Sequence, residues 1–170
     1  MSAAHQNINQ DSGNTEWYTD PVIIEAARRT MGNIDLDPAS SERANQFVRA
    51  SHFFTEKDDS LNRPWFGRVW MNHPYGRVNN KLWIEKLLYE YGGKHMNQAC
   101  CITFAATSER WFQPLLALPQ CFLSPRTNYF SPDGTKKTGV TKGSVVTYMG
   151  DRPEVFNTEF RHFGTVKIAY

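Results

Sequence analysis

Apolar residues recur at helical spacing in two segments of the chain. Residues 21–31 begin with Pro21, which suits a first helical turn, and Gly32 follows the last periodic position. A second amphipathic pattern covers residues 79–91 and stops at a pair of glycines. Both segments are predicted to be helices. Two weaker patterns predict helices that start within residues 39–45 and extend over residues 108–118, the latter with Ser108 as a possible N-cap.

Short apolar or alternating runs lie between these helices. They predict strands at residues 34–37, 51–55, 67–72, 99–104, 121–123 and 144–148. Strands that alternate with helices predict an α/β fold with a mostly parallel central sheet flanked by helices. Ligands of such sheets bind beyond the carboxyl ends of the strands, where this chain carries Asp35, Asp37 and Asn72.

Length and composition favour one globular domain. The chain has 170 residues, and we expect a single domain over residues 15–170 after a flexible polar tail at residues 1–14. No apolar run approaches the ~18 residues of a membrane helix, so no membrane association is expected. Three cysteines without a CxxC spacing predict neither disulfides nor a zinc site and suit a reducing cytoplasm. The histidines have no ligand-like spacing, so no metal is expected.

Charge is distributed unevenly. Residues 1–62 hold 5 Lys and Arg against 10 Asp and Glu, whereas residues 63–170 hold 14 against 7. This asymmetry fits a cationic small molecule at one end and a polyanion at the other, or it is scatter in a short chain. The segment 126–143 carries four cations that either face solvent or contact phosphates: Arg126, Lys136, Lys137 and Lys142.

The tetrapeptide Asn72-His73-Pro74-Tyr75 directly follows a predicted strand. An exocyclic amine on a nucleobase is a poor nucleophile because its lone pair is delocalised into the ring. Two acceptors that hold both N–H groups turn this lone pair outward, and the Asn72 side-chain oxygen and the His73 carbonyl can serve. Tyr75 offers a flat face for a base flipped out of its helix. The alternative for Asn72 is a simple turn before Pro74.

This tetrapeptide resembles the Asn/Asp-Pro-Pro-Tyr motif of amino-group methyltransferases that use S-adenosylmethionine. Together with other segments in the same order, the chain resembles the phage-type DNA N6-adenine methyltransferases; these segments are residues 16–19, 34–40, 59–61 and 65–70. The resemblance implies a minimal Rossmann-like fold, an S-adenosylmethionine cofactor and double-stranded DNA as partner. It also implies the cytoplasm, that of a host if the protein is phage-encoded. A homodimer would double the DNA contacts.

The resemblance also implies roles for individual positions. Asn72, His73, Pro74 and Tyr75 would form the transfer site, although the family usually has proline where this chain has His73. The cofactor would be bound by Trp17, Thr19, Asp35, Asp37, Pro38, Ala39, Asp59 and Asn72. Asp37 would attract its cationic amino group, and either Glu56 or Asp58 would bind its ribose.

Other interpretations stay open at this point. Similar tetrapeptides serve any planar nitrogen, so RNA or a protein glutamine is an alternative substrate. His73 could instead mark an inactive relative that only binds DNA. Asp37 could be an ordinary capping carboxylate at a strand end. Trp65, Trp70 and Trp83 are assigned to the core.

Overall fold

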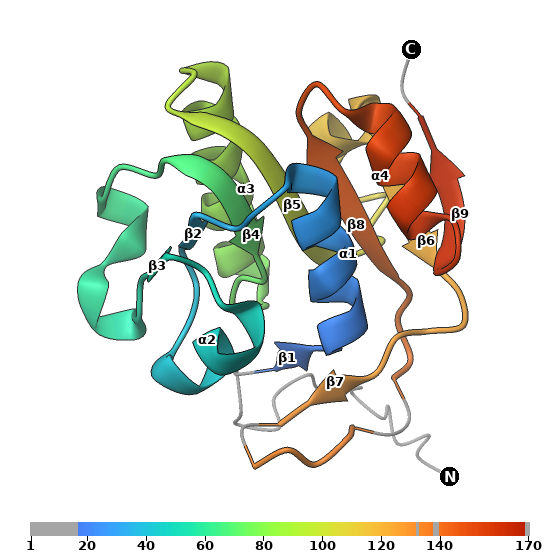
Figure 1. Ribbon diagram of the computed structural model, residues 1–170, viewed down its shortest axis with the longest axis horizontal. Coiled ribbons are helices and arrows are strands. Elements are labelled where there is room, and N and C mark those ends of the chain that lie inside the picture. Colours follow the sequence, from blue (N-terminus) through green and yellow to red (C-terminus); the bar gives the residue numbers. More distant parts are fainter. Residues whose placement is uncertain (1–16, 132, 138–139, 169–170) are drawn as a thin grey trace, which may run out of the picture.

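A seven-stranded sheet with helices on both faces forms the body of the protein (Figure 1). The computed structural model describes residues 17–131, 133–137 and 140–168, so the predicted tail at residues 1–14 lies outside the described residues. In spatial order the strands are β3 (His52–Phe53), β2 (Leu36–Asp37), β4 (Gly67–Met71), β5 (Met96–Phe104), β8 (Ser144–Met149), β6 (Gln120–Leu123) and β9 (Gly164–Lys167).

The sheet is mixed, which corrects the expectation of a mostly parallel one. Strands β3, β2, β4 and β5 pair in parallel, whereas β8, β6 and β9 join through antiparallel pairs. The reason is that the segment between β6 and β8 does not cross back over the sheet, so β8 begins at the edge of the sheet where β6 ends. Strand β8 therefore enters from that edge and runs opposite to β5 and β6, between which it lies.

Helices cover the two faces. On one face, α1 (Pro21–Met31) packs beside α4 (Pro153–Phe160); α3 (Arg77–Gly92) lies on the other (Figure 1). The short α2 (Glu42–Val48) follows β2, and three 3-10 helices span Glu56–Asp58, Ser60–Asn62 and Gln113–Ala117. The Asp20 side chain caps the start of α1 by accepting from the Val22 N–H, and Gly32 ends it with a φ of 89°.

Alternating side chains of the strands build two cores. In β4, Trp70 faces the α1 and α4 side, whereas Val69 and Met71 face the α3 side. All three side chains are buried. The α3 side also holds Trp65 and Trp83, which pack with ring centroids 5.9 Å apart. The core assignment of the three tryptophans is thereby confirmed.

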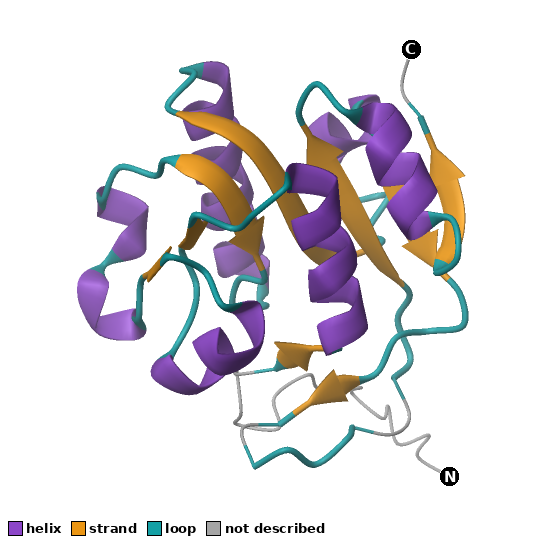
Figure 2. Cartoon of the chain, viewed as in Figure 1, coloured by secondary structure: helices purple, strands orange, loops and turns teal. Residues whose placement is uncertain are grey.

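Several elements differ from the sequence-based expectation. The predicted helix at 108–118 is a run of turns followed by the 3-10 helix Gln113–Ala117, because Pro114 has no N–H to continue an α-helix. Helix α4 and strand β9 were not predicted. Nor was the two-stranded ribbon of β1 (Tyr18–Thr19) and β7 (Tyr129–Phe130), which Figure 2 shows beyond the end of the main sheet. No helix in the described part of the chain is long and apolar enough to cross a membrane.

Candidate active site

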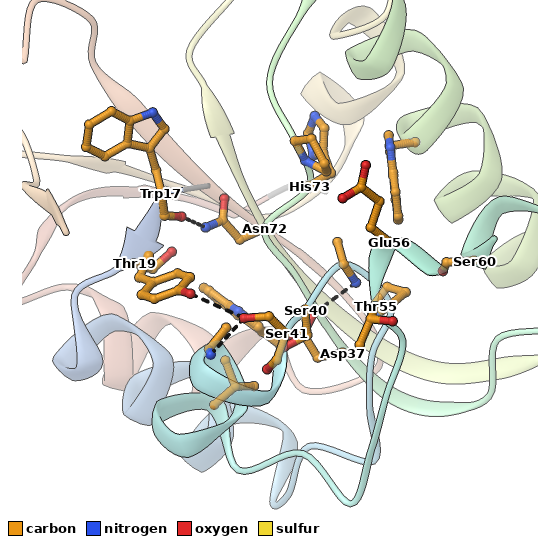
Figure 3. A pocket seen from close by; sticks show the side chains of 18 of the residues that line it. Trp17, Thr19, Asp37, Ser40, Ser41, Thr55, Glu56, Ser60, Asn72 and His73 are labelled. Atoms are coloured by element: carbon orange, nitrogen blue, oxygen red, sulfur yellow. Dashed lines mark hydrogen bonds between the residues drawn. The ribbon is translucent and has the colours of Figure 1, made fainter. Parts of the chain in front are cut away.

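A cavity of about 470 Å³ lies at the edge where the parallel strands end (Figure 3). Because β2, β3 and β4 are parallel, the loops that follow them meet at this edge. The loop after β2 contributes residues 38–41, the loop after β3 contributes Thr55 and Glu56, and the loop after β4 contributes residues 72–75. Strand β1 and helices α2 and α3 also contribute residues to the lining of the cavity. A volume of this size suits a small-molecule ligand.

The Asn72 side chain is held at both ends. Its Nδ2 donates to the Trp17 carbonyl oxygen at 2.7 Å, which joins the start of β1 to the loop after β4 (Figure 3). Its Oδ1 accepts from the Tyr75 hydroxyl at 3.0 Å. These contacts fix which end of the amide is the oxygen, and Oδ1 keeps a second lone pair for another donor. An oriented acceptor thus stands at the cavity wall.

Tyr75 belongs to a chain of hydroxyl groups. Its hydroxyl lies 3.4 Å from that of Tyr129, which in turn lies 2.7 Å from the Ser144 hydroxyl. Burial raises the pKa of both tyrosines, so both are neutral near pH 7. The Tyr75 ring packs against Phe104, at the end of β5, with centroids 4.6 Å apart. The ring is therefore held by contacts from β5 and from the ribbon.

The turn from Asn72 to Tyr75 leads directly into α3. Gly76 makes this possible with a φ of 150°, a conformation that side chains rarely adopt. His73 is buried and, like Pro74, lines the cavity. Burial lowers the pKa of His73 to about 4, although a hydrogen bond with Asn80 raises it in part. The ring is neutral near pH 7.

Asp37 is a buried carboxylate at the end of β2. It is 3% exposed, and its Oδ1 accepts from the Ala39 N–H at 3.1 Å. Burial raises the pKa of Asp37 to about 7, against hydrogen bonds from Ala39 and Ser40 that lower it. The ion pairs found among residues 17–131, 133–137 and 140–168 do not include Asp37. A cation brought into the cavity would find this carboxylate without a partner.

Two further predicted residues come from the start of the described chain. Thr19 is buried, and its hydroxyl has no hydrogen-bond partner within the described structure. The Thr19 hydroxyl is thus a buried polar atom without a partner in the described part of the chain, on a residue that lines the cavity. Trp17 is half-buried, and the Lys137 Nζ lies 4.0 Å from the centroid of its ring.

The acidic candidates separate clearly. Asp59 and Glu56 line the cavity. Asp58 instead accepts hydrogen bonds from the Thr55 N–H at 2.8 Å and the Thr55 hydroxyl at 2.7 Å, which lower the pKa of Asp58. Its carboxylate therefore stabilises the local turn. Of the two alternatives for a ribose, Glu56 is the one on the cavity.

Asp35 is not among the cavity residues. Its carboxylate accepts from Arg68 Nε at 2.7 Å and from the Arg68 N–H at 2.8 Å, and the side-chain bond is the main cause of its lowered pKa. Gly67 allows this approach, because a Cβ there would lie 2.6 Å from Asp35 Oδ2. Asp35 therefore fastens the segment before β2 to β4, and we leave it out of the site.

The four predicted DNA contacts all lie in the segment between β6 and β8, which we call the basic loop (residues 124–143). Lys137 reaches Trp17, and the Lys142 Nζ lies 5.5 Å from the Phe104 ring that packs on Tyr75. Lys136 is exposed beside β7. Arg126 is exposed and donates to the Val140 carbonyl at 3.4 Å. Two of the four cations thus stand beside aromatic residues of the site.

Sequence reasoning missed several residues of the cavity. They are Ser40, Ser41, Phe47, Thr55, Ser60 and Asn79. Trp83 belongs to the core as predicted, yet it also forms part of the cavity wall. Ser40 and Ser41 come three and four residues after Asp37, and their position in the loop after a strand was a usable signal. Nothing in the sequence pattern distinguishes Asn79 or Trp83 from other helix residues.

An oriented amide acceptor beside a tyrosine, at the ligand-binding edge of an α/β sheet, suits an enzyme that acts on a planar amine. Residues 6–159 match the family model of DNA N-6-adenine-methyltransferase (Dam). The chain therefore belongs to this family and is a DNA adenine N6-methyltransferase, with DNA as its substrate. No curated protein matches the chain.

The buried Asp37 predicts an unusual pH dependence of stability. With a folded pKa of about 7 against an ordinary 3.8, the folded state keeps the proton longer than the unfolded state. The free energy of unfolding should therefore lose up to about 1.4 kcal/mol per pH unit between about pH 4 and pH 7 through this group. Urea denaturation at several pH values should show that the free energy of unfolding of Asp37→Asn increases relative to that of the wild type as pH rises. A difference that does not change with pH would contradict the argument.

Proposed function

We propose that the methyl donor is S-adenosylmethionine and that the 470 Å³ cavity binds it. The cavity offers a group for each part of this molecule. Asp37 would hold the ammonium group, because it is a buried carboxylate without a cation. Thr19, with its unpaired hydroxyl, and Trp17 would hold the rest of the methionine end.

The nucleoside end would occupy the opposite part of the cavity. Pro38 and Ala39 would form the loop against which the cofactor lies, Glu56 would bind the ribose hydroxyls, and Asp59 would sit near the adenine. A carboxylate accepts hydrogen bonds from both hydroxyl and amino groups, which suits both positions.

The transfer site is the turn Asn72–Tyr75. Asn72 Oδ1 and the His73 carbonyl would accept the two N–H groups of a flipped adenine. Holding both N–H groups turns the nitrogen lone pair out of conjugation with the ring. The observation that carries this proposal is the orientation of the Asn72 amide, which the Trp17 carbonyl and the Tyr75 hydroxyl fix with the oxygen available. The flat face of Tyr75 would stack on the adenine.

No general base is required at this turn. When bound, S-adenosylmethionine supplies an electrophilic methyl group on a sulfonium, which leaves as a neutral thioether. Asn72 and the neutral Tyr75 are not bases near pH 7, and burial lowers the pKa of His73 to about 4, so these groups would hold the amine without removing a proton beforehand. The proton would leave the nitrogen for solvent afterwards.

We further propose that the sheet is a minimal Rossmann-like sheet and that the basic loop binds double-stranded DNA. The first point is supported by the cavity at the carboxyl edge of the parallel half. The second is supported by four cations on a loop that borders the transfer site. A homodimer remains a prediction.

The reaction itself can be tested with unmethylated DNA, S-adenosylmethionine and nucleoside mass spectrometry. We expect N6-methyladenine and no methylated cytosine from the wild type. Asn72→Ala should lower kcat by at least about 100-fold, because it removes an oriented acceptor from the transfer site. Asn97→Ala, an exposed asparagine on β5, is the matched control and should keep full activity. Full methylation by Asn72→Ala would rule out the role given to this amide.

The binding mode of the cofactor predicts a selective loss of affinity. Asp37→Asn should weaken S-adenosylmethionine by ~2 kcal/mol or more, about 30-fold, because it leaves a buried ammonium unpaired. The affinity of the wild type should also fall as pH drops below about 7, where Asp37 becomes protonated. Isothermal titration with 5′-methylthioadenosine, which lacks the amino-acid end, is the control and should show no change. An equal loss for both ligands would mean that Asp37 does not hold the ammonium.

The basic loop predicts a salt-dependent contribution to DNA binding. Lys136→Gln and Lys142→Gln should each weaken binding to duplex DNA and reduce the slope of log affinity against log salt by about 1. Lys94→Asn, exposed at the far end of α3 with a φ of 58°, should change neither. Fluorescence anisotropy at several salt concentrations gives both quantities. If both loop variants show the wild-type slope of log affinity against log salt, the basic loop does not contact the DNA phosphates.

A further inference from the structure

The His73 ring is enclosed by side chains of α3 and by Tyr75. The residue is 1% exposed. Its ring stacks on Trp83 with centroids 6.3 Å apart and planes 24° apart, and it meets the Tyr75 ring edge-on at 5.5 Å. Its Nε2 lies 2.9 Å from Asn80 Oδ1. The His73 ring therefore contacts two residues of α3, Asn80 and Trp83, and one residue of its own turn, Tyr75.

These contacts determine the chemical state of the ring. An amide oxygen only accepts, so the hydrogen of the neutral ring is on Nε2. Nδ1 is buried and has no partner in the described structure. With one nitrogen bonded to Asn80 and the other closed off, neither nitrogen is available to take a proton from a substrate.

We propose that His73 is a positioning residue, whose ring ties the Asn72–Tyr75 turn to α3 through Asn80 and Trp83 and thereby fixes the His73 carbonyl as an acceptor. The inference rests on the proposed function, because it concerns the same carbonyl. On one side the turn is held by the Asn72 bond to Trp17. On the other side the ring supplies the restraint, since histidine has no ring that fixes its own backbone φ as proline does.

A proline offers a different way to reach the same result. Its ring fixes φ near −65° without any contact to a neighbouring element. No hydrogen bond from the His73 N–H is found among the described residues, so proline would remove none. If the histidine ring acts only by holding the backbone, proline should replace it and should make the contact with Asn80 unnecessary.

The test is a set of four variants: His73→Ala, His73→Pro, Asn80→Ala and the double variant His73→Pro with Asn80→Ala. We expect His73→Ala and Asn80→Ala each to lower kcat by about 10- to 100-fold, since a misplaced acceptor affects the reacting geometry, with little change in the KM for DNA. The kcat of His73→Pro should stay within about threefold of the wild-type value. Adding Asn80→Ala to His73→Pro should not lower kcat further. Glu85→Ala, an exposed residue of α3, is the control.

Two outcomes would overturn the proposal. A His73→Pro protein as slow as His73→Ala would show that the imidazole itself is needed, and an Asn80→Ala protein with full activity would show that the contact positions nothing. Thermal unfolding and cofactor binding should accompany each variant. If His73→Ala does not fold, Asn80→Ala, which changes a partly exposed helix position, carries the comparison.

A second measurement separates this inference from the proposed function. Nitrogen NMR of the His73 ring should show a neutral ring with its hydrogen on Nε2 at pH 6, and Asn80→Ala should give a mixture of the two tautomers. A hydrogen on Nδ1 in the wild type would refute the contact. If the wild type methylates no DNA, the proposed function fails, whereas this spectrum still decides whether His73 is bound to Asn80.

Discussion

Because a side-chain amide has one donating and one accepting end, the bond from Asn72 Nδ2 to the Trp17 carbonyl fixes the orientation of the Asn72 amide, on which the proposed reaction depends. It places the donating end toward the start of β1 and leaves the oxygen toward Tyr75 and the cavity. It also draws the beginning of the described chain across the edge of the sheet. Trp17 and Thr19, which line the cavity, are thus joined to the loop after β4 by the same bond that orients the Asn72 amide.

The antiparallel half of the sheet supports this arrangement from the other side. Strand β8 starts at the edge where β5 ends, so Ser144 and Phe104 are paired neighbours there. Ser144 bonds the Tyr129 hydroxyl, and Phe104 packs on the ring of Tyr75. A fully parallel sheet would begin its next strand at the opposite edge and would not bring these groups to the site. The mixed topology therefore supplies the contacts that hold the aromatic part of the transfer turn.

The sequence predicts the elements whose signals are local. The helix at 21–31 has the same ends in the structure, because Asp20 and Gly32 terminate it through their own backbone and side chain. The turn at Asn72 could be placed because a proline and a glycine follow a clear strand. Helix α4 could not, since its eight residues are stabilised by the packing of Phe156 and Phe160 between distant elements.

The candidate site was predictable to a similar extent. Asp37, a polar residue at the end of a predicted strand, lines the cavity as its position in the pattern suggested. Asp35, two residues earlier, has the same local signal, but its partner Arg68 comes from another strand. The contribution of Trp83 and the contact between His73 and Asn80 also depend on how α3 lies against the turn. Such pairings arise from tertiary structure and leave no pattern in a single sequence.

Charge is divided along the cavity in a way that matches methylation of an amine. At the end proposed to bind the cofactor, Asp37 is a buried acid that a bound cation would ionise by lowering its raised pKa. At the transfer end, burial keeps His73, Tyr75 and Tyr129 neutral. A charged base here would compete for the amine hydrogens that must stay bonded to orient the lone pair. In the proposed arrangement the neutral turn would hold the amine without deprotonating it. Lys137 and Lys142 of the basic loop stand beside Trp17 and Phe104, where phosphates rather than the base would meet them.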